Sequence, residues 1–162
     1  MKKLLALALM LSLMLIPARA EEIQSLQLGS SALYVSVDIS FIPGALDDED
    51  FALGMVGYYF SPNYDMDFDV YQWTLAEGDT QDSEAEEEAV LYEAQLLESE
   101  INGIRILYYF TNEWDEGILY PSLTCLMQDG ESIVELVFWL DGEDALIMAD
   151  EIMHSLECRL PE

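Results

Sequence analysis

The sequence contains very few basic residues. Lys and Arg together number 5, against 33 Asp and Glu among 162 residues, which gives a formal net charge of −28 at pH 7. Proteins that bind nucleic acids or anionic membrane surfaces need Lys and Arg to contact phosphate groups. The composition therefore excludes nucleic acid as a partner and excludes adsorption to an anionic membrane. Acidity this strong favours a dissolved, self-repelling surface.

Histidine is almost absent as well, which limits the possible catalytic sites. The only one, His154, lies near Asp150 and Glu151 in a predicted helix, and helical spacing places it opposite the apolar stripe, in solvent. No G-x-S-x-G, H-E-x-x-H or glycine-rich phosphate motif occurs. The sequence therefore predicts no catalytic residue, no metal site and no cofactor, and it indicates that the protein is not an enzyme.

Cysteine is limited to one pair, Cys125 and Cys158. An even number of cysteines in an exported protein can form a disulfide. Cys125 falls on a predicted strand and Cys158 just beyond the last predicted helix, so the end of that helix could bring the two thiols together. Two separately buried thiols fit the sequence equally well, and both interpretations stay open.

A long apolar run occurs only at the start of the chain. Lys2 and Lys3 precede an apolar stretch that ends at Ile16, and the small-residue pattern of Ala18 and Ala20 follows. This arrangement is typical of a secretory signal peptide cleaved after Ala20. We therefore expect residues 1–20 to be a signal and residues 21–162 to form one exported α+β domain, periplasmic or extracellular. Loss of the signal takes the net charge to −31, with no membrane insertion afterwards.

The stretch "DMDFDVYQW" carries an Asp at every second position, namely Asp65, Asp67 and Asp69. A calcium loop of the EF-hand type would need Gly at its sixth position and Glu at its twelfth, where this sequence has Val70 and Ala76. Apolar residues fill the alternate positions, a pattern that indicates a strand. We therefore predict a strand over 67–73 with its aspartates in water, and a weak divalent-cation site as the alternative.

Hydrophobic periodicity predicts the remaining elements. Strands are expected over 33–41, 53–60, 101–110, 117–128 and 131–140. Asp129-Gly130 marks a hairpin between the last two. Helices are expected over 83–98 and 141–156, the first with a capping box formed by Ser83 and Glu86. The predicted fold is α+β, a mainly antiparallel sheet of about six strands with two helices packed on one face, in the order β-β-β-α-β-β-β-α.

This order, together with "VSVDISFIP", "EINGIRILYY" and "VELVFWLDGEDALIMADEIMHSL", resembles the PsbP-like fold. The resemblance extends over residues 33–156 and depends on the hydrophobic pattern. That family includes extrinsic proteins of photosystem II, a Ran-binding nuclear import factor and small uncharacterised bacterial secreted proteins. The resemblance implies a non-enzymatic accessory or binding module, and it identifies no functional residue.

Aromatic residues are plentiful and fall mainly on predicted strands. Neighbouring aromatics must point to opposite faces of a sheet, so both faces carry apolar area. An ordinary core explains this pattern, and an aromatic groove with acidic edges explains it as well. The sequence therefore predicts a binding or accessory module for an unknown protein or small ligand, with a low-affinity acidic cation binder as the alternative. The residues chosen for the binding surface are Tyr71, Trp73, Tyr109 and Trp139.

Overall fold

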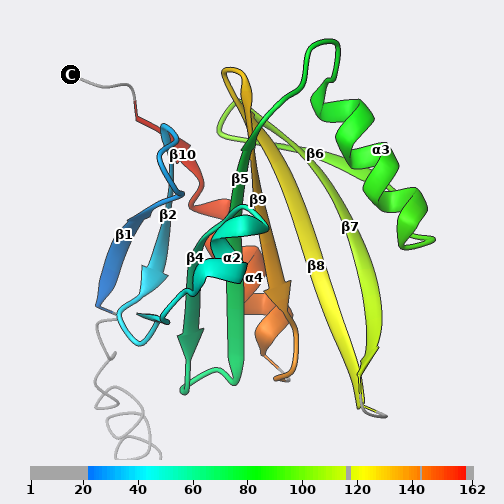
Figure 1. The fold of residues 1–162 in the computed structure, drawn as a ribbon. Helices are drawn as coiled ribbons and strands as arrows, with labels where there is room; N and C mark the ends of the chain where they lie inside the picture. The colour runs from blue at the N-terminus through cyan, green and yellow to red at the C-terminus, as the bar shows by residue number, and fades with distance from the viewer. Residues whose placement is uncertain (1–21, 116–117, 143, 160–162) are drawn as a thin grey trace, which may run out of the picture.

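The computed structural model describes residues 22–115, 118–142 and 144–159, and the expected signal peptide lies outside them. A seven-stranded antiparallel sheet forms the centre of the molecule (Figure 1). In spatial order its strands are β3 (Ile42–Pro43), β4 (Met55–Ser61), β5 (Met66–Thr74), β9 (Ser132–Trp139), β8 (Ile118–Asp129), β7 (Ile104–Asp115) and β6 (Leu97–Ile101). The predicted α+β class with a mainly antiparallel sheet is confirmed.

A small second sheet packs beside the first. It contains β1 (Ile23–Gln27), β2 (Leu33–Asp38) and β10 (Glu157–Cys158), in the order β1-β2-β10. The alternation predicted over 33–41 holds within β2, because Leu33, Val35 and Val37 are buried while the intervening residues are partly exposed. The strand ends at Asp38, however, and Ile39, expected on the buried face, is 48% exposed. These three side chains join the larger apolar core, which also contains Phe68, Phe138 and Leu136.

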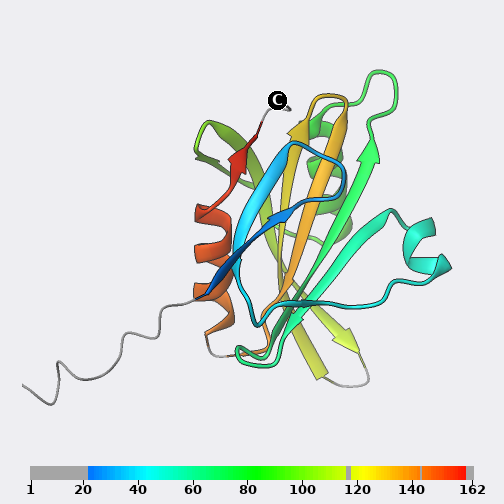
Figure 2. The ribbon, with the colours of Figure 1, turned by 90° about the vertical axis from the view of Figure 1, so that its left-hand side faces the viewer.

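The helices lie on opposite faces of the main sheet, and our expectation of both on one face is wrong. Helix α4 (Ala145–His154) belongs to the larger core, with Ile106 and Met127. Helix α3 (Gln81–Leu91) packs on a separate cluster that contains Leu107 and Leu126. Residues adjacent in a strand point to opposite faces, so the two clusters are separated by the sheet. In Figure 2, α4 lies on one side of the sheet and α2 (Asp48–Ala52) projects on the other.

Helix α3 is shorter than predicted and begins earlier. Its N-cap is Thr80, whose side chain accepts a hydrogen bond from the backbone of Ser83 while the Ser83 hydroxyl accepts one in return. The helix ends before Glu93, which has a φ of 51°. The residues that follow form β6, joined to β7 by a turn in which Asn102 and Gly103 have φ values of 52° and 80°. Such positive φ values at both central residues are typical of a two-residue hairpin turn.

The two cysteines are separate. Cys125 is 3% exposed in the larger core, whereas Cys158 is exposed on β10, and both are free. The structure thus favours the interpretation of two separate thiols over a disulfide. That interpretation expected both thiols to be buried, and this holds for Cys125 only. Among the described residues, no helix is long and apolar enough to cross a membrane.

Candidate functional site

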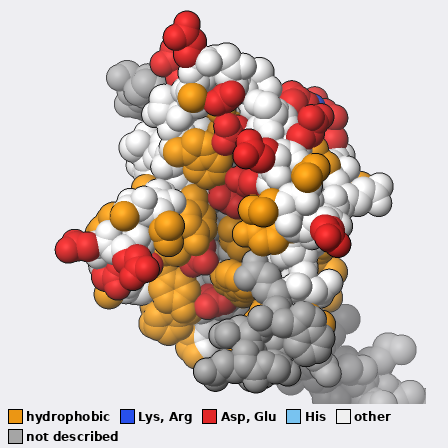
Figure 3. Space-filling view, turned by 45° about the vertical axis from the view of Figure 1, so that its right-hand side comes forward, with side chains coloured by type: hydrophobic (Ala, Val, Ile, Leu, Met, Phe, Trp, Pro, Cys, Tyr) orange, Lys and Arg blue, Asp and Glu red, His pale blue; other side chains and the backbone are white. Residues whose placement is uncertain are grey.

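A groove lies on the face of the main sheet opposite α4, between α3 and the end of α2. Its volume is about 550 Å³, within the range of small-molecule and side-chain pockets. Figure 3 shows it as a hollow with hydrophobic side chains on its sides and acidic ones along its bottom. The floor consists of Tyr71, Trp73, Tyr109, Thr111, Ser122, Thr124, Glu135, Val137 and Trp139, and the walls of Leu53, Glu84, Glu88, Leu91 and Tyr92.

All four aromatic residues selected from the sequence line this groove. Strand register explains why they meet. Tyr71 of β5 is paired with Glu135 of β9, and Tyr109 of β7 is paired with Thr124 of β8. Trp139 lies four residues beyond Glu135 on the same strand and therefore on the same face. The structure thus brings together residues that are up to 68 positions apart in the chain, from Tyr71 to Trp139.

Carboxylates hold the polar atoms of three of these aromatic side chains. The indole Nε1 of Trp73 donates a hydrogen bond to Glu84 (3.2 Å), and that of Trp139 donates to Asp69 (2.9 Å). The hydroxyl of Tyr109 donates to Glu88 (3.0 Å). Bonds to ionised acceptors are stronger than neutral ones. The aromatic floor is therefore fixed in orientation before any ligand arrives.

One carboxylate on the floor has no such partner. Glu135 is partly buried at the centre of β9. Among the described residues, no group donates a hydrogen bond to its carboxylate oxygens, and none forms an ion pair with them. The pKa of Glu135 is raised to about 8, mainly by burial and in addition by the nearby charges of Glu88 and Asp69. Desolvation of a carboxylate favours its neutral form. Glu135 is therefore mostly protonated at neutral pH.

Asp69 corrects the prediction that the aspartates of β5 point into water. It is only 7% exposed. Burial is the main cause that raises its pKa to about 6, the hydrogen bond from Trp139 opposes that rise, and the charge of Asp67 adds to it. Asp67 in turn accepts a hydrogen bond from the hydroxyl of Tyr58 (3.0 Å). The alternate aspartates thus serve as acceptors for aromatic side chains.

The predicted cation site finds no support in the geometry. Within the described ranges, no group of three or more His, Cys, Asp or Glu side chains could hold a metal ion. Asp67 and Asp69 accept from Tyr58 and Trp139 instead, and Asp65 is exposed. The expected surface position of His154 is confirmed, because it is exposed on α4, away from the groove, with its Nδ1 near the carboxylate of Asp150 (3.3 Å).

Sequence reasoning missed the acidic half of the groove. Glu84 and Glu88 belong to an acidic stretch that the sequence predicts to be the start of a helix. Because the chain has 33 Asp and Glu residues, the presence of two more carboxylates does not by itself indicate a binding site. Glu135 did carry a signal. It is the only charged residue within "SIVELVFWL", and a lone charge inside an apolar strand marks a special position, because burial of an unpaired charge is costly.

Comparison with known proteins identifies the fold. No family model matches the sequence, and no curated protein matches it. The solution structure of cyanobacterial PsbP (CyanoP) from Synechocystis sp. PCC 6803 matches with a TM-score of 0.65 at 8% identity, over 88% of this chain and 96% of that one. LpqN, described as involved in cell envelope biogenesis of Mycobacterium tuberculosis, matches with a TM-score of 0.57 at 11% identity, over 88% and 94%.

A protein from Bacteroides thetaiotaomicron VPI-5482 also matches, with a TM-score of 0.57 at 16% identity. The match covers 83% of this chain, which spans half the length of the Bacteroides protein. At these identities the likeness concerns the fold alone. The chain has a PsbP-like fold, as its pattern of elements predicts.

Proposed function

We propose that this PsbP-like chain is an exported, non-catalytic binding module that takes its ligand or partner into the groove between α3 and α2. The expected signal peptide supports export, and so does the likeness to LpqN, which is described as involved in cell envelope biogenesis. The scarcity of histidine and of catalytic motifs supports a role without chemistry. Accessory or binding roles also agree with what the family resemblance implies.

One observation carries the proposal. A face of the sheet that is aromatic and pre-oriented is left hollow, with an unpaired carboxylate at its centre. Sites that bind ligands combine concave aromatic surfaces with a few convergent polar groups. A face that served packing alone would gain stability by filling this volume, because protein interiors are close-packed.

The test is an unbiased screen for binding. We would add a fragment library and a peptide library to ¹⁵N-labelled protein and follow the backbone amide signals. The expected result is that perturbations concentrate on β5, β9 and α3, and that Trp73→Ala and Trp139→Ala each abolish them. Tyr34→Ala is the matched control, because Tyr34 is a partly exposed aromatic residue in the small sheet, beneath Arg159. The proposal fails if every binding event survives both tryptophan substitutions.

A further inference from the structure

The groove carries negative charge that the protein itself does not neutralise. Glu84 and Glu88 line it, Asp69 lies next to it under the indole of Trp139, and Glu135 adds a further charge when it ionises. No Lys, Arg or His is among the described residues that line the groove. Elsewhere in the described chain, both arginines are already paired with acids. They are Arg105, with Asp82 and Glu98, and Arg159, with Glu157.

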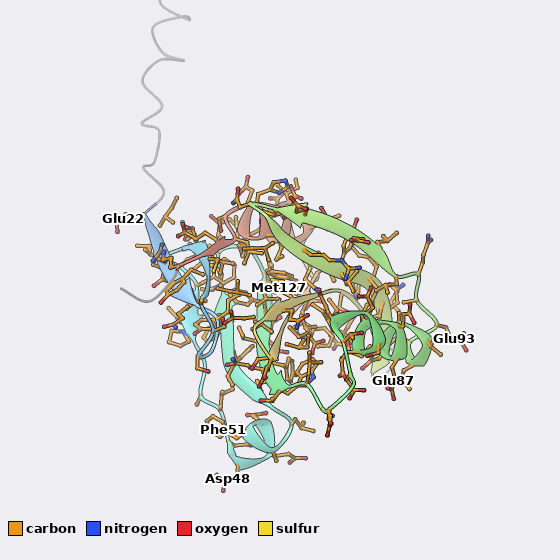
Figure 4. All side chains as sticks on the ribbon, turned by 90° about the horizontal axis from the view of Figure 1, so that it is seen from above. Glu22, Asp48, Phe51, Glu87, Glu93 and Met127 are labelled. Atoms are coloured by element: carbon orange, nitrogen blue, oxygen red, sulfur yellow. The ribbon has the colours of Figure 1, made fainter. Side chains whose placement is uncertain are left out.

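Two exposed apolar edges stand on either side of this acidic floor. On one side, Leu53 lines the groove and is 69% exposed. On the other, Leu91 at the end of α3 lines the groove and is 74% exposed. Figure 4 shows α2, which carries Phe51, and α3 as two projections on the same side of the sheet. We call Leu53 and Leu91 the apolar lips. Exposed apolar side chains at the border of a groove are typical of interaction surfaces.

We propose that the groove receives an arginine or lysine side chain of a polypeptide partner, with apolar residues next to that side chain covering the lips. The inference rests on the proposed function, because it names the occupant of the same groove. Charge complementarity selects the cation. The lips select a polypeptide, because a small cation bound at the floor alone would leave Leu53 and Leu91 in water.

The chemistry of the floor suits a guanidinium group. The faces of Trp73, Trp139 and Tyr71 offer cation–π contacts, and Glu135, once it has lost its proton under the influence of the bound cation, offers a bidentate acceptor for two N–H groups. Such a pair is shielded from water once the lips are covered. Arginine should therefore be preferred to lysine, since its planar fork matches both the carboxylate and the aromatic faces.

Binding of a cation should release a proton. Glu135 faces titratable groups on three elements, and it is neutral at pH 7 because burial raises its pKa to about 8. A guanidinium beside it favours the ionised form and lowers that pKa. Affinity should therefore rise as the pH increases from 6.5 to 8.5, while arginine stays charged throughout. The groups facing Glu135 are Asp69 and Tyr71 on β5, Glu88 on α3 and Tyr109 on β7.

The first experiment selects peptides without bias. A library of displayed random heptapeptides would be selected on the wild-type protein and, in parallel, on Glu135→Gln. We expect the wild-type protein to enrich sequences with one basic residue, mostly Arg, between apolar residues, and Glu135→Gln to lose that enrichment. Folding of the variant is verified by circular dichroism. Enrichment of acidic or uncharged sequences that compete at the groove would overturn the inference.

The second experiment measures the affinity of one selected peptide. Replacement of its Arg by citrulline, which keeps the shape and removes the charge, should weaken binding about 30-fold, as should Glu135→Gln. Leu53→Ser and Leu91→Ser should each weaken it about fivefold, whereas Leu146→Ser, an exposed leucine on α4, should not. The affinity of the Glu135→Gln variant for the peptide should change less with pH than that of the wild-type protein.

The small-molecule occupant is tested with N-acetyl-arginine amide. If it binds as tightly as the peptide, the lips contribute nothing and the polypeptide assignment is wrong. Neutral fragments or neutral peptides bound in the groove would refute the cationic occupant and leave the proposed function standing. Failure of both the fragment and the peptide screens to yield any groove ligand would overturn the proposed function itself.

Discussion

Glu135→Gln should stabilise the protein at alkaline pH, although it removes a side chain from the centre of the candidate site. In the folded state burial raises the Glu135 pKa from 4.5 to about 8. Below pH 4.5 the carboxyl is protonated in both the folded and the unfolded state and has no effect. Between pH 4.5 and 8 the folded state retains the proton and the unfolded state does not, so stability falls as the pH rises. Above pH 8 the folded chain carries the full cost of the buried charge.

The size of the effect follows from the same pKa change. The interval from 4.5 to about 8 corresponds to about 5 kcal/mol at about 1.36 kcal/mol per pKa unit. Water in the open groove screens part of this cost, so we expect a gain of about 2 kcal/mol for Glu135→Gln at pH 8.5. In a domain of this size, such a gain raises Tm by about 6 °C. At pH 4.5 the variant and the wild type should melt together.

Thermal melts monitored by circular dichroism from pH 4.5 to 8.5 provide the assay. Glu131→Gln is the matched control, because Glu131 is an exposed residue just before the same strand and its replacement removes the same charge. That control separates the local cost from relief of general repulsion in a chain of net charge −28. Equal shifts in the two variants at pH 8.5, or a loss of stability in Glu135→Gln, would refute the reasoning.

Three further outcomes follow from the described contacts. A thiol reagent should label Cys158 rapidly in the native protein and Cys125 only after unfolding, because burial makes Cys125 inaccessible and raises its pKa; two fast equivalents would contradict this. Phe138→Ala should lower the free energy of unfolding by about 3–5 kcal/mol, since Phe138 is fully buried, and a denaturant titration should show a far smaller loss for the half-exposed Phe110→Ala. Thr80→Ala should cost about 1 kcal/mol through loss of the α3 cap, and an unchanged melt would exclude that cap as a stabilising contact.

The strands were the most predictable part of the fold, because their side chains alternate. In β2 and β5 the apolar residues recur every second position and face the core. The hairpin at Asp129-Gly130 also lies as expected, with a two-residue connection between Asp129 and its partner Ser132. Such signals are local, since turn chemistry and alternation act over a few residues.

The placement of the helices was not predictable in the same way. An apolar stripe shows that a helix packs on something, but not which face of the sheet receives it. Ala85 and Ala89 of α3 would fit either face. The sequence predicts a loop where α2 lies, because Pro43-Gly44 opens that stretch with a turn signal. The start of α2 nevertheless carries a capping box, in which Asp47 and Asp50 each accept a hydrogen bond from the other's backbone.

The aromatic half of the site was predictable for the same reason as the strands. Tyr71 and Trp73 share one face by alternation, and so do Glu135 and Trp139. That these strands are neighbours, and that α3 closes one side, depends on long-range pairing that a sequence pattern does not encode. The hydrogen bonds from the indoles to Asp69 and Glu84 depend on that pairing too.

The hollow itself arises from small polar side chains on two neighbouring strands, β7 and β8. On the groove face, β7 and β8 present Thr111, Ser122 and Thr124, whereas the alternate residues Leu123 and Cys125 of β8 lie on the core face. The hydroxyl side chains of Thr111, Ser122 and Thr124 fill less space than leucine would. Helix α3 covers only the part of this face near Leu107 and Leu126. A chain selected for stability alone would gain from apolar residues there and at Glu135. Stability is given up where the rings and the carboxylate meet, which is the pattern expected of a binding surface.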